Sequence, residues 1–221
     1  MAPTGPEDLH ISDNPYPGRS PLPALTERDF AWAQVNPGKW QYYVDPRADK
    51  SAVQEVNVLG GRLADDKGGF TDVWVNPDFT PMSESVDIQF ATELELVLWR
   101  LSWGFNDLGR FIDAFSRSEL LVVLPADDPQ GDKGWPLRSS RGELILDVYT
   151  SAGRLPPDVN PWLRRKASGR ELLERVCPME NVYISFHSGN DANPVIPGSD
   201  MVRFWREWCD VQGATADPEK R

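Results

Sequence analysis

The pattern of hydrophobic residues changes near Ser83, and this change constrains the fold more than any other feature of the sequence. Before it, short aromatic and β-branched runs alternate with Gly, Pro and Asp turns, which is typical of antiparallel strands. After it, apolar residues recur at the three- and four-residue spacing of amphipathic helices. We therefore predict an α+β (mixed α/β) fold, with a small antiparallel β subdomain at residues 25–83 and a sheet-and-helix domain at residues 84–212.

Three segments carry the strand pattern of the first part, at residues 40–44, 53–63 and 70–75. The Asp- and Gly-rich turn at residues 65–69 lies between the last two, which predicts a hairpin or meander. From residue 30 onward this part contains only strand-like runs broken by turns.

The second part is predicted to mix helices and strands. In chain order the expected elements are a helix at 90–101, a helix at 108–115, strands at 120–125 and 144–149, a helix from 169, a strand at 182–186 and a last helix from 200. Asn106, Ser168 and Ser199 are the expected N-caps, and Ser168 with Glu171 matches the capping box. The continuous apolar run 120–125 indicates a strand covered on both faces.

Both ends of the chain differ from this pattern. Residues 1–24 hold six prolines and few large apolar groups, which predicts an extended or disordered arm, and residues 213–221 form a polar, flexible tail. The N-terminus lacks the basic and apolar regions of a secretory signal, and no apolar stretch approaches the ~20 residues of a membrane span. We expect a cytoplasmic protein without membrane insertion.

The charge balance limits the kinds of partner. Asp and Glu number 34 against 23 Lys and Arg, a net charge of −11. This surplus disfavours nucleic acids and anionic lipid surfaces, whereas a basic protein partner is compatible with it. The basic triplet at residues 164–166 is predicted to be a solvated turn.

Candidate catalytic residues are few. His10 lies in the Pro-rich arm and His187 follows a predicted strand. Cys177 and Cys209 have no motif spacing and are expected to be reduced, partly buried thiols, with a disulfide between them as the alternative. The sequence has no nucleophile elbow, no phosphate-binding loop and no ligand spacing for zinc. We predict no enzyme activity, no catalytic residues, no metal site and no cofactor.

The nine Trp residues are more informative. Trp99 and Trp205 fall on periodic helix faces and are expected in the core. Trp135 and Trp162 lie in loops rich in Gly and Pro, and exposed loop Trp is typical of interface anchors. The alternative for both is a ring that folds back onto the core.

Asp127, Asp128 and Asp132 form an acidic cluster in the loop that contains Trp135. Their spacing is not that of a calcium loop, and their alternative is a solvated turn. We assign these three residues, with Trp135 and Trp162, to a candidate protein-binding site.

Several short motifs extend over residues 30–208: Pro-Gly-Lys-Trp at 37–40, Val-Asp-Pro at 44–46, Gly60, Trp-Val-Asn-Pro-Asp-Phe at 74–79, Leu-Val-Val-Leu-Pro at 121–125, Val-Tyr-Thr-Ser at 148–151 and Pro-Gly-Ser at 197–199. The first four resemble actinobacterial proteins associated with type VII secretion. The last three resemble the SseB-like (enhanced serine sensitivity) N-terminal-type domain that is usually fused to them. The sequence departs from that pattern at residues 93–104, which are richer in Leu and Trp.

This resemblance implies a non-enzymatic accessory protein and carries over no catalytic residues. Our first hypothesis is therefore a cytoplasmic adaptor that binds another protein, such as a secretion component or a secreted substrate. The second is an acidic immunity protein that neutralises a secreted toxin, because acidity suits a basic target. The third is an enzyme that uses His187, Cys177 or the Asp127 loop.

Overall fold

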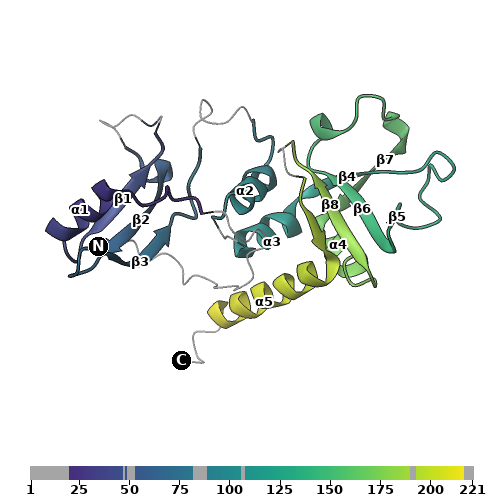
Figure 1. The fold of residues 1–221 in the computed structure, drawn as a ribbon. Helices are drawn as coiled ribbons and strands as arrows, with labels where there is room; N and C mark the ends of the chain where they lie inside the picture. Colours follow the sequence, from purple (N-terminus) through teal and green to yellow (C-terminus); the bar gives the residue numbers. More distant parts are fainter. Residues whose placement is uncertain are drawn as a thin grey trace. The chain divides into compact units, whose positions relative to one another are not determined.

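A computed structural model describes residues 20–46, 48, 53–81, 89–105, 108–189 and 193–216. The fold is mixed α+β, as predicted, with a three-stranded antiparallel sheet followed by a six-stranded mixed sheet and its helices (Figure 1). The described chain forms two compact units. The N-terminal unit holds residues 20–81, 89 and 100–105, and the C-terminal unit holds 90–99 and 108–216. The described residues do not include the predicted boundary at residue 83, His10, Asn106 or most of the arm.

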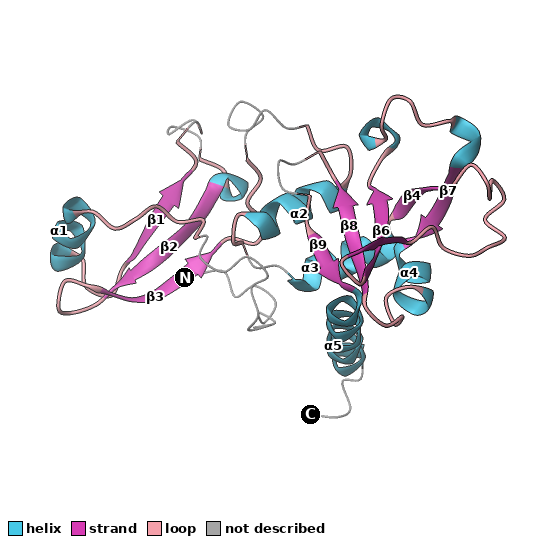
Figure 2. Cartoon of the chain, turned by 45° about the vertical axis from the view of Figure 1, so that its right-hand side comes forward, coloured by secondary structure: helices cyan, strands magenta, loops and turns pink. Residues whose placement is uncertain are grey.

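The N-terminal unit contains a helix and three strands. Its elements are α1 (Glu27–Val35), β1 (Trp40–Val44), the 3-10 turn η1 (Glu55–Asn57), β2 (Val58–Ala64) and β3 (Phe70–Val75). The strands pair antiparallel in the order β1-β2-β3 (Figure 2). Strands β1 and β3 have their predicted bounds, and the turn between β2 and β3 is where the sequence places it.

Helix α1 is a correction, because the sequence predicts only strand-like runs from residue 30. The apolar spacing of α1 is weak, and Ala33 is its only buried apolar residue. The helix begins instead with a capping box, in which the backbone N–H of Thr26 donates to the carboxylate of Asp29 at 2.8 Å. The Gln41 side-chain amide of β1 donates to the other Asp29 oxygen at 2.8 Å, so one buried carboxylate fixes the helix to the sheet.

The C-terminal unit is built on the larger sheet. Its elements are α2 (Glu93–Ser102, whose residues 93–99 belong to this unit), α3 (Leu108–Arg117), β4 (Glu119–Val123), β5 (Arg138–Ser140), β6 (Glu143–Tyr149), the 3-10 turns η2 (Ala152–Arg154) and η3 (Pro161–Leu163), β7 (Arg164–Ser168), α4 (Gly169–Arg175), β8 (Val182–His187), β9 (Val195–Pro197) and α5 (Gly198–Ala216). The strand order is β7-β4-β6-β8-β9, with β5 also paired to β6. Of these pairs only β6 and β8 run parallel.

The core lies between one face of this sheet and helices α3, α4 and α5. Strand alternation sends every second side chain of β4, β6 and β8 to that face, where they are buried. The ring centre of Phe186 on β8 lies 5.8 Å from that of Phe111 and 5.5 Å from that of Phe115, both on α3. On the opposite face Leu121 and Val123 of β4 are only half-buried, so the prediction that this strand is covered on both faces is wrong.

Other local predictions have mixed outcomes. The hydroxyl of Ser168 accepts the Glu171 N–H at 3.0 Å and caps α4, as predicted. Ser199 is not a cap, because α5 begins one residue before it. Residues 164–166 are not a solvated turn, since they form edge strand β7, where charged side chains discourage pairing with another chain.

The two Trp residues assigned to the core also differ. Trp99 is buried, whereas Trp205 is only half-buried on α5. In the part of the chain that the structure describes, no helix combines the length and apolarity needed to cross a membrane.

Candidate functional site

The acidic cluster of the candidate site is held together by one buried carboxylate. Asp128 is 6% exposed and accepts the backbone N–H groups of Asp132 at 2.9 Å and Lys133 at 3.0 Å. Asp127 is exposed and pairs with the Lys133 ammonium at 2.7 Å, which lowers the pKa of Asp127. Asp128 therefore shapes the loop, and only Asp127 and Asp132 are available to a partner.

Trp135 lies against the edge strand of the sheet. Its ring stacks beneath the guanidinium of Arg165 on β7, 4.3 Å from the ring centre. Arg165 also donates to the carboxylate of Glu171 on α4 at 3.2 Å. Trp135 is half-buried, so this residue combines both of its predicted alternatives, a packed ring and a partly accessible one.

Trp162 is the most exposed large apolar residue of the described chain, at 87%. It lies in η3, where the Asn160 side-chain oxygen accepts the Trp162 N–H at 3.0 Å and fixes the turn. An exposed indole on an ordered turn loses little conformational entropy when a partner covers it.

The structure brings these loops to one end of a strand pair. Strands β4 and β7 run antiparallel with Val123 opposite Arg164, and the Leu124 N–H donates to the Leu163 carbonyl at 2.7 Å. The acidic loop leaves the end of β4, and the Trp162 turn enters the start of β7. We call this group the β7-end surface; its members are Asp127, Asp132, Trp135, Trp162 and Arg165.

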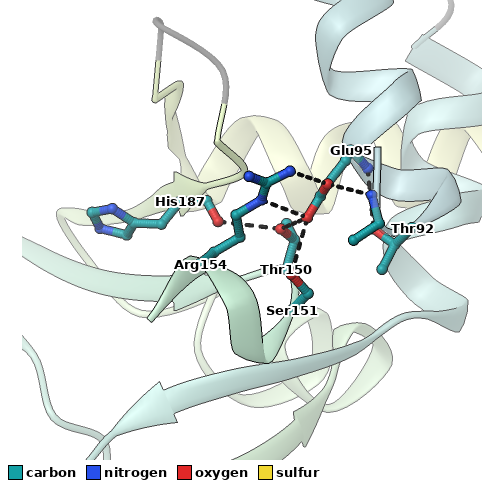
Figure 3. Close-up of polar contacts among 7 residues, drawn as sticks. Thr92, Glu95, Thr150, Ser151, Arg154 and His187 are labelled. Atoms are coloured by element: carbon teal, nitrogen blue, oxygen red, sulfur yellow. Dashed lines mark hydrogen bonds and ion pairs between the residues drawn. The ribbon is translucent and has the colours of Figure 1, made fainter. Parts of the chain in front are cut away.

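A second cluster, which the sequence does not predict, surrounds Glu95 on α2. Glu95 is fully buried and receives five hydrogen bonds (Figure 3). Arg154 binds it through Nε at 3.1 Å and Nη2 at 2.8 Å, and the Thr150 hydroxyl donates at 2.6 Å. The Ser151 hydroxyl at 3.3 Å and the Ala91 N–H at 2.7 Å complete the set.

This cluster is structural. Burial alone would raise the pKa of Glu95, but the hydrogen bonds from Arg154, Thr150 and Ala91 together lower it. The carboxylate is ionised and its acceptor sites are occupied, so it fastens the start of α2 to the segment after β6. No local pattern reveals it, because Arg154 lies 59 residues further along the chain.

His187 has a partner that the sequence also misses. Its Nε2 lies 3.1 Å from an Asp147 oxygen, and Arg138 Nε donates to the other oxygen at 2.7 Å. The Tyr149 ring stacks on the imidazole at 4.5 Å. Burial raises the pKa of Asp147, but hydrogen bonds from Arg138, His187 and Ser185 lower it overall. Figure 3 shows the imidazole turned away from Glu95.

The two thiols lie apart from this histidine. Cys177 lines a cleft with Val182 and Tyr183 at the start of β8, whereas His187 ends that strand, about 17 Å further along. Cys177 is buried, which raises the pKa of its thiol to about 12, and Cys209 is exposed. Both thiols are free, but neither is partly buried, which corrects the expectation from the sequence.

This difference in burial predicts a selective thiol reaction. In native protein at neutral pH we expect Cys209 alone to react rapidly with a thiol reagent, and both thiols to react after unfolding in urea. Cys209→Ser should remove the fast phase. A fast phase that persists in Cys209→Ser would contradict the burial of Cys177.

Within the described residues no three His, Cys, Asp or Glu side chains gather as a metal site would require. The fold and these clusters define a two-unit α+β protein with an aromatic and charged surface at the end of an edge strand. The chain matches no protein-family model, no curated protein and no solved structure.

Proposed function

We propose that this protein is a non-enzymatic cytoplasmic accessory or adaptor protein that binds another protein through the β7-end surface. The observation that carries the proposal is the exposure of Trp162, 87%, on a turn held by its own cap. Trp and Arg are enriched among the residues that contribute most to binding. Trp135 lies in the neighbouring loop and packs against Arg165 on strand β7.

The resemblance in the sequence supplies the context. Its motifs resemble those of accessory proteins of type VII secretion, and on that likeness we propose a secretion component or a secreted substrate as the partner class. The titratable groups support binding over catalysis. Glu95 and Asp128 are occupied by structural hydrogen bonds, and the buried Cys177 lies near the start of β8, whereas His187 lies at its end.

Substitution of the indoles tests the proposal. Wild type and the double variant Trp135→Ala/Trp162→Ala would be used to purify partners from the native host, with mass spectrometry to identify them. We expect the affinity for the purified partner to fall about tenfold or more in the double variant, as for interface anchors.

Val35→Ala is the matched control, because Val35 is 76% exposed on α1, outside the proposed surface. It should bind as wild type does. If the double variant keeps its circular dichroism spectrum and its affinity, the β7-end surface is not the binding site.

A second candidate is an immunity protein against a secreted toxin, and the net charge of −11 favours it. Such acidity complements a basic nuclease and speeds association. A toxin gene directly upstream would support this role, whereas secretion ATPase or protease genes would support the adaptor. Co-expression that fails to rescue growth from that toxin would exclude immunity.

A further inference from the structure

The cleft that Cys177 lines in the C-terminal unit is not explained by the sequence or by the proposed function. It has a volume of about 580 Å³, within the range of small-ligand sites. One wall is the face of α5 that carries Ser199, Val202 and Arg206, at the i, i+3 and i+7 spacing of one helix face. Another wall is the loop at residues 178–181, which lies between α4 and β8.

Much of the remaining lining is apolar. Val182 and Tyr183 begin β8, and Pro197 of β9 lies opposite Tyr183 in the strand pairing. Met179 adds an exposed, flexible thioether chain that adapts to the shape of what it contacts. Burial raises the pKa of the Cys177 thiol to about 12, so this thiol is neutral at pH 7 and adds no charge to the cleft. This part of the lining favours an apolar group.

The polar side chains of the cleft form no hydrogen bond or ion pair with other described residues. They are Glu180, Asn181, Tyr183, Ser199 and Arg206. Two of them are charged and exposed, Glu180 on the loop and Arg206 on α5, and they line the same cleft without pairing with each other. The other arginines of α4 and α5 each pair with a carboxylate, so Arg206 differs from its neighbours. The cleft therefore offers one cation and one anion that the described chain does not use.

We propose that this cleft binds a small zwitterion with an apolar side chain, either a free apolar α-amino acid or an apolar dipeptide. The ligand carboxylate pairs with Arg206, because a guanidinium can donate two parallel N–H groups to a carboxylate. The ligand ammonium pairs with Glu180, and the apolar side chain packs on Met179, Val182 and Val202. A ligand with one charge would leave Arg206 or Glu180 unpaired. The cleft shares no residue with the β7-end surface, so this proposal stands or falls independently of the proposed function.

The test is an NMR titration in which the amide signals of the full chain, labelled with nitrogen-15, report the binding of L-leucine and separately of L-leucyl-L-leucine. We expect saturable binding of at least one of them, and the tighter of the two gives the size of the ligand. Glycine and glycylglycine carry the same charges without the apolar side chains. They should bind at least about fivefold more weakly than their leucine counterparts.

Single substitutions test the two ionic contacts. Arg206→Met and Glu180→Gln should each weaken the binding of leucine or leucyl-leucine about fivefold, as expected for one exposed ion pair. The N-acetylated ligand lacks the ammonium, so Glu180→Gln should not weaken its binding. The ligand amide lacks the carboxylate, so Arg206→Met should not weaken its binding. This crossed pattern separates direct contacts from a general change in the cleft.

Arg170→Met and Glu174→Gln are the matched controls, because both side chains are exposed on α4 and neither lines the cleft. Both variants should bind the ligand as wild type does. Circular dichroism checks folding, and if one cleft variant is unfolded the other carries the test. The proposal is overturned if neither leucine nor leucyl-leucine saturates the protein or if the glycine ligands bind equally well. Wild-type affinity in folded Arg206→Met or folded Glu180→Gln would also overturn it.

Discussion

Replacing Glu95 with glutamine is expected to lower the free energy of unfolding by about 3 kcal/mol. The substitution keeps the shape of the side chain but removes its charge, and Arg154 is then left without its ionic partner. The new amide NH2 group must also face the donors of Arg154, Thr150 or Ala91. Because a typical domain is stable by only about 5–15 kcal/mol, this single change should be clearly visible in urea unfolding followed by circular dichroism.

Glu93→Gln is the matched control, because Glu93 lies on the same helix but its side chain is 64% exposed in a long ion pair with Arg117. We expect a change within about 0.5 kcal/mol for this control. Equal unfolding midpoints for the Glu95 and Glu93 variants would show that the Glu95 cluster does not stabilise the fold.

The ion pair between Glu95 and Arg154 also makes the stability of the fold depend on pH. The pKa of Glu95 is lower in the folded protein than in the unfolded chain, so its stabilisation is fully present above the unfolded pKa. It is lost as the pH falls through the folded pKa and the carboxylate is protonated. The difference in stability between wild type and Glu95→Gln should therefore shrink in acid.

Replacing Gly169 with alanine is expected to cost more than about 4 kcal/mol or to prevent folding. Gly169 is the first residue of α4 and is buried against the end of α3. An added Cβ would meet the Phe115 carbonyl oxygen and lie 2.6 Å from its carbon. These are backbone atoms, which cannot move aside as a flexible side chain can. The Gly169 N–H also donates to the Ser118 carbonyl at 2.9 Å, which holds α4 in this position.

Gly153→Ala is the control for this effect, since a Cβ there has open space and the backbone is not in the left-handed region. We expect its thermal unfolding midpoint to match that of wild type, while Gly169→Ala loses the transition or shifts it far down. Similar midpoints for the two variants would mean that α3 and α4 do not pack as closely as the structure shows.

The candidate site was predictable in part. Loop composition pointed to Trp135, Trp162 and the Asp cluster, and the structure brings their loops to one end of the β4–β7 pair. The sequence could not separate Asp128, which is buried, from Asp127 and Asp132, because the difference is one of backbone N–H contacts within the loop. It also missed α1. The buried residues of this helix are Asp29 of the capping box and Ala33, so the helix has little apolar periodicity.

The sequence by itself determined the α+β class, the bounds of β1 and β3, and the Ser168 cap, because each depends on residues that are neighbours along the chain. Only the tertiary structure decided which polar groups meet. Asp147 faces His187 because β6 and β8 pair in one parallel register, and Arg154 reaches Glu95 across 59 residues. Strand register and helix docking are set by the burial of the whole core, so no local pattern specifies them.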